Sequence, residues 1–324
     1  MVSYTHRQIH NILLRAEHPI FIADERIDAD ALGSALALAD HMAAYGKIVP
    51  VFVSSQVPDQ YKTLPRVNQC TSDASVFNRA DIDLVVSFDC SDGKYVSGFV
   101  GAIPGHPLLI NIDHHATNDR YGDINQVLPD APATAYIIYR FFEANGILPS
   151  REAATCLLAG LCFDTTSFTN SSTNDEALET ASKLVLLGAR VQDAIRSLYC
   201  SRSVAALRVW GLALERLQED REQGTISTFL TRADFAQHGV TDEDVEGISN
   251  FLNIVTDSEI LSVLRETEDG GVKVSMRSLT RDVSVIAKSN GGGGHARAAG
   301  YKIFDATLVC DEWGCWRVEK KQVV

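Results

Sequence analysis

The sequence has no long apolar run and is poor in basic residues. Over its 324 residues no segment approaches the length of a membrane span, and the first 25 lack the apolar core of a signal peptide. Lys and Arg number 29 against 42 Asp and Glu, which gives a formal net charge of −13. This balance argues against a broad basic surface, although it permits a local basic pocket. We therefore expect no membrane association and no binding of long duplex DNA.

Cysteine is also scarce, and its spacing excludes two kinds of site. The seven cysteines show no paired spacing typical of zinc sites, and an odd number scattered through apolar segments does not indicate a disulfide framework. Free thiols in a reducing compartment are the simpler interpretation, so we expect a cytoplasmic protein. The cysteines are Cys70, Cys90, Cys156, Cys162, Cys200, Cys310 and Cys315.

The first half of the chain alternates short apolar runs with helical patterns. Apolar runs bounded by turn signals predict buried strands, and the longer periodic segments predict helices. Such alternation is typical of a doubly wound, mainly parallel sheet, which binds ligands at the carboxyl ends of its strands. The expected strands are 19–23, 47–54, 83–89 and 107–113, and the expected helices are 31–46 and 132–146.

The second half predicts a smaller α+β domain. A helix is expected to begin at a capping box of Thr173 and Glu176 and to end at Gly188. We expect a catalytic domain at 1–190, a helical linker at 191–220 and a substrate-binding domain at 221–324, with the site in the cleft between the two domains. Further strands are expected at 225–230, 259–266 and 272–278, and a helix at 242–255.

Carboxylates follow the predicted strand ends. They should meet at one edge of the sheet, where several buried carboxylates require either protons or cations. Divalent metal ions are the better solution, because "NIDHH" (111–115) adds imidazole ligands to the hard oxygen ligands. The acidic candidates are Asp24, Asp28, Asp30, Asp89, Asp113 and Asp164.

The glycine-rich stretch "GGGGHARAAG" (291–300) predicts a second kind of site. Consecutive glycines expose backbone N–H groups, and "HARAAG" is expected to begin a helix whose N-terminus binds an anion. A flexible linker is the alternative interpretation of the glycines. In the strand at 272–278, alternation places Arg277 on the face opposite Val274 and Met276.

Taken in order, "DADALGS", "SFDCSD", "NIDHH", "GLCFDTTSF" and "GGGGHARAAG" resemble the DHH phosphoesterase superfamily with its DHH-associated C-terminal domain. The resemblance covers roughly residues 8–304 and is greatest to the nanoRNase group of oligoribonucleases, which often also act as phosphatases on 3'-phosphoadenosine 5'-phosphate. It implies two metal ions per chain, usually manganese, with magnesium as the alternative, and a short oligonucleotide or dinucleotide as substrate. A homodimer is left open.

The resemblance also implies a role for each motif residue. Asp28 would bind the first metal, Asp30, His114 and Asp164 the second, and Asp89 would bridge both. His115 would lie beside the substrate phosphate, and Asp113 would support the histidines. The implied substrate-binding residues are Arg277, Gly292, Gly293, Gly294 and His295.

One position departs from the family pattern. Asp24 stands where the family usually places a histidine ligand of the first metal. We expect an active enzyme with weakened first-metal affinity, because the other motif positions are present. The leading hypothesis is a metal-dependent phosphodiesterase that hydrolyses very short oligonucleotides to mononucleotides. The alternatives are a 3'-phosphoadenosine 5'-phosphate phosphatase or cyclic-dinucleotide phosphodiesterase, and a nucleotide-binding sensor with a degraded metal site.

Overall fold

A computed structural model describes residues 2–170, 172–199, 202–310 and 316–320. The chain forms two compact units, residues 1–201 and 202–324. The first is built on a six-stranded parallel sheet and the second on a separate mixed sheet, so the predicted α/β class is confirmed. None of the described helices is both long and apolar enough to cross a membrane.

The sheet of the first unit has the strand order β3-β2-β1-β4-β5-β6. The order reverses beside β1, as in doubly wound folds, which bind ligands at this switch point. The strands are β1 (Pro19–Ala23), β2 (Val51–Phe52), β3 (Cys70–Thr71), β4 (Leu84–Phe88), β5 (Leu108–Asp113) and β6 (Ile124–Val127).

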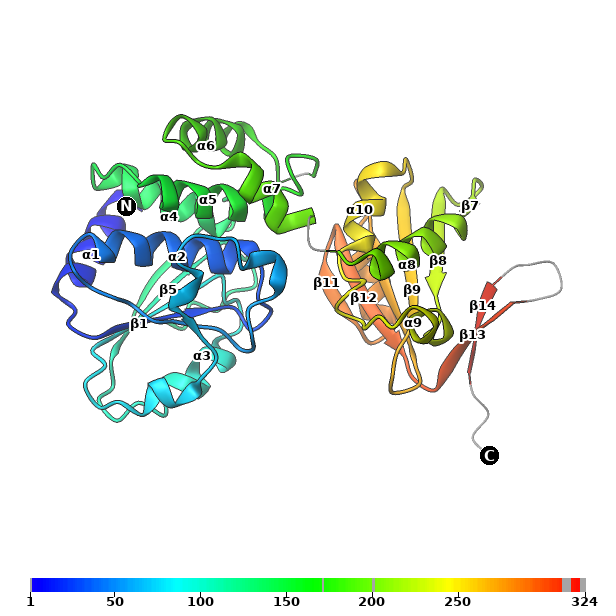
Figure 1. The fold of residues 1–324 in the computed structure, drawn as a ribbon, viewed down its shortest axis with the longest axis horizontal. Coiled ribbons are helices and arrows are strands. Elements are labelled where there is room, and N and C mark those ends of the chain that lie inside the picture. The colour runs from blue at the N-terminus through cyan, green and yellow to red at the C-terminus, as the bar shows by residue number, and fades with distance from the viewer. Residues whose placement is uncertain (1, 171, 200–201, 311–315, 321–324) are drawn as a thin grey trace. The chain divides into compact units, whose positions relative to one another are not determined.

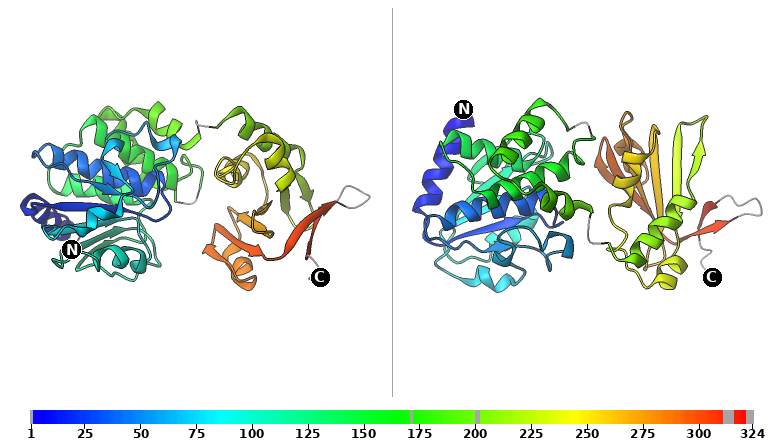
Figure 2. Two further views of the ribbon diagram at one scale, coloured as in Figure 1. Left: turned by 60° about the horizontal axis from the view of Figure 1, so that its bottom comes forward. Right: turned by 45° about the horizontal axis from the view of Figure 1, so that its top comes forward.

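Helices cover both faces of this sheet (Figures 1 and 2). Alternate residues of β1 point to opposite cores, Phe21 to the core under α2, α4 and α5, and Ile22 to the core under α3. The α-helices are α1 (Val2–Arg15), α2 (Ala29–Ala43), α3 (Gly93–Val100), α4 (Thr134–Ala144), α5 (Arg151–Asp164), α6 (Asp175–Leu186) and α7 (Val191–Tyr199). Three 3₁₀ turns are η1 (Asp59–Tyr61), η2 (Val67–Gln69) and η3 (Ala74–Asn78).

The contact between α2 and α5 positions the site. A Cβ atom at Gly33 would overlap the carbonyl oxygen of Cys156, and one at Gly160 would lie 2.7 Å from Oδ1 of Asp30. Only glycine permits helices to approach this closely. The pairing of Gly33 with Cys156 and of Asp30 with Gly160 makes the helices antiparallel. The start of α2 therefore lies beside the end of α5, which carries Asp164.

Two local predictions in this unit were wrong. The strand expected at 47–54 contains only Val51 and Phe52, because Pro50 has no N–H to extend the ladder, although its carbonyl accepts from Phe21. The expected capping box does not form. Asn174 caps α6 instead, and its side chain accepts from the N–H of Ala177 at 2.8 Å.

The sheet of the second unit has the order β11-β12-β10-β9-β8-β7, and a separate β13–β14 pair follows it. Helices α8, α9 and α10 cover one face, and α11 covers the other. The helices are α8 (Val204–Glu215), α9 (Arg232–His238), α10 (Ile248–Val255) and α11 (Val283–Ser289). The strands are β7 (Gln218–Asp220), β8 (Thr225–Leu230), β9 (Ile260–Glu266), β10 (Val272–Arg277), β11 (Gly293–His295), β12 (Ala298–Ile303), β13 (Ala306–Cys310) and β14 (Trp316–Lys320).

The segment expected as a linker, residues 191–220, contributes a helix to each unit. Helix α7 packs on α5, and α8 packs on β8 and α9. The helix expected at 242–255 begins only at Ile248, because Gly247 adopts a left-handed φ of 85° before it. No helix follows the glycine-rich stretch, which contradicts the expected anion site at a helix N-terminus. The stretch forms the β11–β12 hairpin instead.

Candidate metal centre

Asp89 follows β4 directly and turns back toward the neighbouring strand. Its φ is +63°, a left-handed conformation that costs free energy in a residue with a Cβ atom, and its N–H donates to the carbonyl of Ile112 at 2.9 Å. The side chain is 3 % exposed. The hydroxyl of Thr134 donates to its Oδ1 at 2.8 Å. The turn thus holds a buried carboxylate at the carboxyl edge of the sheet.

Asp30 is held by the N-terminus of another helix. The backbone N–H groups of Thr134 and Ala135, at the start of α4, donate to its two carboxylate oxygens at 2.6 and 2.8 Å. These N–H groups have no partner within their own helix, and the helix dipole favours a negative charge there. Asp30 is fully buried. Its burial, together with the charge of Asp164, raises its pKa to about 7, although His114 and the α4 amides oppose the shift.

His114 points one ring nitrogen at the carboxylates. Its Nδ1 lies 3.1 Å from the carbonyl oxygen of Ala131, which can only accept, so Nδ1 carries a proton. Nε2 therefore faces Oδ2 of Asp164 at 2.9 Å and Oδ1 of Asp89 at 3.5 Å. Without a metal, burial opposes protonation, but the hydrogen bond and charge of Asp164 outweigh it and raise the pKa of His114 to about 10. A cation among these carboxylates would take the place of that proton.

His115 lies beside His114, with the ring centroids 4.7 Å apart, and faces the same oxygen of Asp89. Its Nδ1 is 2.8 Å from Oδ1 of Asp113 and 3.5 Å from Oδ1 of Asp89. Asp113 is fully buried and also accepts from the backbone N–H groups of His114 and His115 at 2.7 and 3.0 Å. Burial raises the pKa of Asp113, but the hydrogen bonds from His115 and Asn118 outweigh it and lower that pKa.

Two sets of three ligand atoms each lie within 4.8 Å of one another among the described residues: Asp30, His114 and Asp164, and Asp89, His114 and His115. Asp24 and Asp28 belong to neither set. Asp28 is the N-cap of α2, and its Oδ1 accepts from the N–H groups of Asp30 and Ala31 at 3.0 and 2.9 Å. Half-buried Asp24 follows β1, and its Oδ2 accepts from the N–H of Arg26 at 3.2 Å.

The electrostatics favour cations at this edge. Burial, with the charges of neighbouring carboxylates, raises the pKa values of Asp28 and Asp89 well above their usual range, and burial raises that of Asp24. Carboxylates this close raise one another's pKa values, so some of them stay protonated unless a cation is bound between them. Carboxylate oxygens and an imidazole nitrogen suit hard divalent ions such as Mn²⁺ and Mg²⁺. The donor set therefore fits divalent metal.

A strained segment follows Asp164. Thr166, Ser167 and Phe168 have left-handed φ values of 49°, 56° and 66°. Such conformations cost about 1 kcal/mol or more each, so neighbouring contacts must hold them. The N–H of Ser167 donates to the carbonyl of Cys162 at 2.7 Å, and the side chain of Asn170 donates to the carbonyl of Asp164 at 2.7 Å. These bonds fix the backbone on which Asp164 stands.

Sequence reasoning missed Thr134 and undervalued Asn118. Thr134 contacts Asp30 through its N–H and Asp89 through its hydroxyl. It follows Ala133 in an apolar helix start without a polar N-cap residue, and that missing cap was the available signal for an outside acceptor. Asn118, to which the sequence assigned no role, donates to Asp113 at 2.6 Å.

In the second unit, Arg277 lies at the end of β10 on the face opposite Val274 and Met276, as predicted. Its guanidinium donates to Oδ1 of Asn250 at 2.7 Å and to the carbonyl of Met276 at 2.8 Å. Burial lowers the pKa of Arg277.

The predicted glycine residues serve the β11–β12 hairpin. A Cβ at Gly292 would overlap the carbonyl oxygen of Gly300, and one at Gly294 would lie 2.5 Å from that of Ala298. Gly293 pairs with Gly300 in the ladder. The backbone of His295 pairs with Ala298, and its side chain lies outside the described part of the structure.

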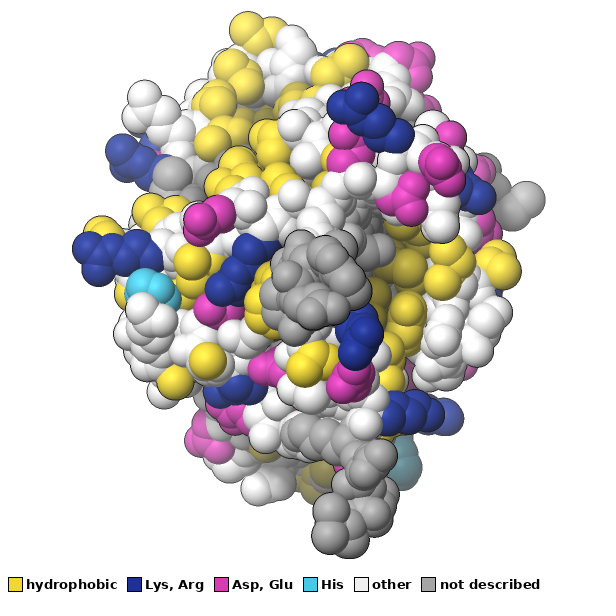
Figure 3. Space-filling model, turned by 90° about the vertical axis from the view of Figure 1, so that its right-hand side faces the viewer, with side chains coloured by type: hydrophobic (Ala, Val, Ile, Leu, Met, Phe, Trp, Pro, Cys, Tyr) yellow, Lys and Arg dark blue, Asp and Glu magenta, His cyan; other side chains and the backbone are white. Residues whose placement is uncertain are grey.

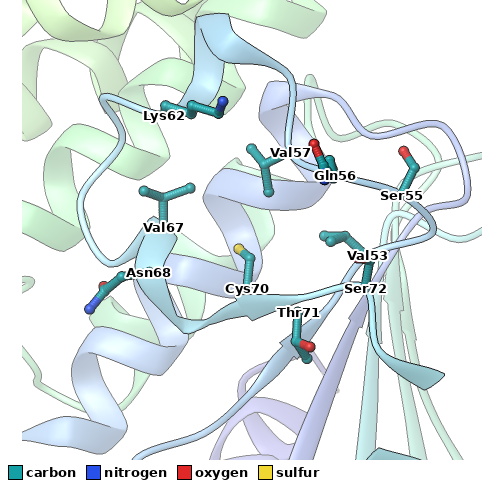
Figure 4. Close-up of a pocket in the computed structure, with 10 residues that line it drawn as sticks. All are labelled: Val53, Ser55, Gln56, Val57, Lys62, Val67, Asn68, Cys70, Thr71 and Ser72. Carbon is teal, nitrogen blue, oxygen red and sulfur yellow. The ribbon is translucent and has the colours of Figure 1, made fainter. Parts of the chain in front are cut away.

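A hollow of about 300 Å³ lies apart from the ligand groups, at the ends of β2 and β3 (Figure 4). Val53, Val57, Val67 and Cys70 turn toward it in the figure, and Lys62 lies at its rim. It is lined by no carboxylate or imidazole. None of the candidate ligands named above lines this hollow, so it is not part of the site.

Comparisons with known proteins identify the two domains of the chain. The model of the DHH family N-terminal domain matches residues 19–161, and that of the DHHA1 domain matches residues 223–309. A protein of Thermus thermophilus named bifunctional oligoribonuclease and PAP phosphatase NrnA is 30% identical over 297 residues, which cover 91% of this chain and 87% of the relative.

Two solved structures share the fold. An exopolyphosphatase-related protein from Bacteroides fragilis superposes with a TM-score of 0.83 at 25% identity, covering 92% of this chain and 90% of that one. RecJ of Thermus thermophilus in complex with Mn²⁺ has a TM-score of 0.52 at 14% identity, covering 93% of this chain and 52% of RecJ. The two domain matches and the 30% identity to the NrnA protein of Thermus thermophilus show that the chain belongs to the DHH family, with a DHH domain followed by a DHHA1 domain.

Proposed function

We propose that the protein is a metal-dependent phosphodiesterase that hydrolyses very short oligonucleotides to mononucleotides. The observation that carries this proposal is the meeting of Asp30, Asp89, His114 and Asp164, with His115 beside them. These groups come from α2, β4, β5 and α5, so only the folded domain brings them together. The Thermus relative is named an oligoribonuclease and PAP phosphatase.

The proposed cofactor is manganese, two ions per chain, with magnesium as the alternative. Asp30, His114 and Asp164 would hold one ion, and Asp24 and Asp28 the other, while Asp89 would serve both. When bound, divalent cations activate water and neutralise charge on a phosphodiester. The raised pKa values of the buried carboxylates support this assignment, because a nearby cation would stabilise the charged form of each.

The chain's own residues would orient the substrate phosphate and supply a proton. In this proposal Asp113 orients the His115 ring through Nδ1, and the doubly protonated ring would give its Nε2 proton to the leaving oxygen. Thr134 fixes Asp89 through its hydroxyl and Asp30 through its N–H. The positions of these carboxylates therefore do not depend on flexible side chains alone.

The surface charge supports short substrates. On the face shown in Figure 3, the described Lys and Arg side chains are interspersed with Asp and Glu. Affinity for a long nucleic acid depends on many phosphate contacts by basic residues. With a net charge of −13, the chain suits a substrate recognised through a few groups, and we propose Arg277 and the β11–β12 hairpin for that role.

The test is a substrate panel under matched conditions. Wild-type protein with millimolar Mn²⁺, and with EDTA as the control, is given a labelled diribonucleotide, a 20-nucleotide RNA, 3'-phosphoadenosine 5'-phosphate and a cyclic dinucleotide. We expect metal-dependent cleavage of the dinucleotide, with little cleavage of the long RNA. Preference for 3'-phosphoadenosine 5'-phosphate or the cyclic compound would favour the alternative enzyme. No hydrolysis and no metal binding would favour a sensor.

The four cysteines among the described residues that are free thiols are Cys70, Cys90, Cys156 and Cys162. Burial raises the pKa of Cys70 and of Cys162 to about 12, so both remain unreactive thiols near neutral pH. This chemistry supports the proposed cytoplasmic, reducing compartment.

A further inference from the structure

Three asparagine side chains, two of them buried and one part-buried, form a hydrogen-bonded row that ends at Asp113. Nδ2 of Asn111, on β5, donates to Oδ1 of Asn118 at 2.9 Å and to Oδ1 of Asn125, on β6, at 3.1 Å. Asn111 is fully buried, and Asn118 is 9 % exposed. Asn125 closes the far end, where it accepts from the N–H of Gly122 at 3.0 Å and donates to the carbonyl of Gly122 at 2.6 Å.

Asn118, at one end of this row of asparagines, contacts both turns that carry candidate ligands. Nδ2 of Asn118 donates to Oδ2 of Asp113 at 2.6 Å and to the carbonyl of Cys90 at 3.0 Å. Cys90 follows Asp89, and Asp113 precedes His114. A single amide group therefore joins the turn after β4 to the turn after β5.

The orientation of this amide is fixed by its partners. The N–H of Arg120 can only donate, and it lies 2.8 Å from Oδ1 of Asn118. The carbonyl of Cys90 can only accept, and it lies beside Nδ2. Exchanging the nitrogen and oxygen would break both bonds. Nδ2 therefore faces Asp113 as a donor.

We propose that Asn118 is a positioning residue, which fixes the spacing of the Asp89 and His114 turns and orients His115 through Asp113. Oδ2 of Asp113 accepts from Asn118, while Oδ1 faces Nδ1 of His115 at 2.8 Å. Asn118 holds Oδ2 of the buried carboxylate, while the backbone N–H groups of His114 and His115 hold Oδ1, and the carboxylate keeps the His115 proton on Nδ1. The activity part of this inference rests on the proposed function, but the histidine part does not.

The physical cost of losing Asn118 supports this role. Truncation to alanine would leave a fully buried carboxylate oxygen of Asp113 without this donor and the Cys90 carbonyl without the same amide. The Cys90 carbonyl would keep the hydroxyl of Tyr121 at 3.0 Å. A buried carboxylate oxygen that loses its donor is costly, so Asp113 would shift toward another donor, although two backbone N–H groups still hold its Oδ1. That shift would loosen the contact with Nδ1 of His115. Changing a group that supports a ligand in this way typically reduces activity about 10- to 100-fold.

The experiment compares Asn118→Ala with Asn125→Ala. Asn125 belongs to the same hydrogen-bonded row, but its side chain bonds to Asn111 and Gly122 and not to Asp113 or Cys90. Two readouts are taken on the full chain: the ¹⁵N spectrum of the histidine rings, with His115 identified by a His115→Asn variant, and kcat and KM on the dinucleotide with Mn²⁺. Thermal unfolding is recorded for every variant.

We expect wild type and Asn125→Ala to hold His115 as the Nδ1–H tautomer. Asn118→Ala should show a mixture of tautomers and a kcat lowered about 10- to 100-fold, with KM within about twofold. An unchanged tautomer and kcat in Asn118→Ala, or equal losses in both variants, would overturn the proposal. If Asn118→Ala does not fold, Asn118→Ser, which retains a donor on a shorter side chain, is judged by the same readouts. If the wild type hydrolyses nothing, the proposed function fails and the tautomers alone decide this inference.

Discussion

The backbone N–H of Thr134 donates a 2.6 Å hydrogen bond to Oδ2 of Asp30, 104 residues earlier in the chain. Helix α4 thus begins on a carboxylate at the start of α2, and the N-terminal cap of one helix also fixes a candidate ligand. The Thr134 hydroxyl extends the same contact to Asp89 at 2.8 Å. The metal centre is therefore part of the packing between helices and sheet.

Replacing Thr134 by valine keeps the shape of the side chain and removes its hydroxyl. The backbone bond to Asp30 should survive, and Asp89 should lose one donor. We expect kcat to fall about 10-fold, with a stability loss of about 1 kcal/mol. The control is Thr155→Val, since the buried Thr155 hydroxyl donates to the carbonyl of Arg151, away from the ligands. Equal kcat values for the two variants, measured on the dinucleotide, would count against the role of Thr134.

Asp24→His should restore the family's usual ligand at the end of β1. Aspartate is shorter and harder than imidazole, so the wild type should bind its first metal ion weakly and prefer Mn²⁺ or Mg²⁺ to Zn²⁺. Calorimetric titration with Mn²⁺ should show tighter binding in Asp24→His, with higher activity at low metal concentration. Unchanged metal affinity, together with an unchanged preference between Mn²⁺ and Zn²⁺, would show that position 24 does not contact metal.

Arg277→Ala should impair nucleotide binding more than chemistry. Its guanidinium is tied to Asn250 at 2.7 Å, which presents a fixed cation at the end of β10. We expect KM for the dinucleotide to rise at least 10-fold, while hydrolysis of a small activated phosphodiester stays within about twofold. Lys288→Ala, at the end of α11, removes a surface cation as the control. Equal losses on both substrates would place Arg277 in the chemistry or the fold.

Two buried histidines predict a loss of stability in acid. Burial, with a smaller effect from the charge of Arg140, lowers the pKa of His6 to about 4. Burial, with a smaller effect from the charge of His10, also lowers the pKa of His41 to about 4, although the charge of Asp40 opposes this shift. The unfolded chain binds protons near pH 6.5 and the folded chain does not. Stability is therefore complete above pH 6.5 and falls as the pH drops toward 4, by about 2 kcal/mol per histidine at pH 5.

Urea unfolding at pH 7.5 and pH 5 measures this effect. The double variant His6→Gln/His41→Gln should lose less stability between the two pH values than the wild type. His106→Asn, which changes an exposed histidine, should retain the wild-type difference. The same loss in all three proteins would show that other groups, such as the carboxylates of the metal centre, control the acid response.

The sequence was sufficient for β1, β4 and β5 of the first unit and for the carboxylates at their ends, but it did not indicate β3 or β6. Residues 84–88 are buried at every position and mostly apolar because both faces of the sheet are covered, and Asp89 follows directly at the strand end. Motif order then pointed to metal. These features are local, or depend on a general rule about where parallel strands end.

The remaining features depend on contacts between distant segments. Thr134 and Asn118 gain their roles from acceptors on other elements, and nothing in their immediate neighbours identifies those acceptors. The glycine-rich stretch was misinterpreted for a related reason. Gly292 and Gly294 are needed because β12 packs directly against them, a requirement that appears only when Gly300 and Ala298 are in place.

The central claim is that the buried carboxylates hold two catalytic metal ions, and Asp89→Asn tests it most directly. Asparagine tolerates the left-handed φ of 63° and keeps an oxygen for the Thr134 hydroxyl, so the fold should survive. Removing the charge should also relieve repulsion, because burial and the charges of Asp30 and Asp28 raise the pKa of Asp89.

The decisive measurement is Mn²⁺-dependent hydrolysis of the labelled dinucleotide by wild type and Asp89→Asn. Circular dichroism is recorded for both, and bound metal is counted after gel filtration in buffer that contains millimolar Mn²⁺, so that a weakly bound ion is retained. We expect two Mn²⁺ ions per wild-type chain. In Asp89→Asn, kcat should fall at least about 1,000-fold, which is the order of effect for a group that acts in the chemistry. The metal-free variant should unfold at a temperature no lower than that of the metal-free wild type. Hydrolysis by a folded Asp89→Asn at near wild-type rate would contradict the central claim.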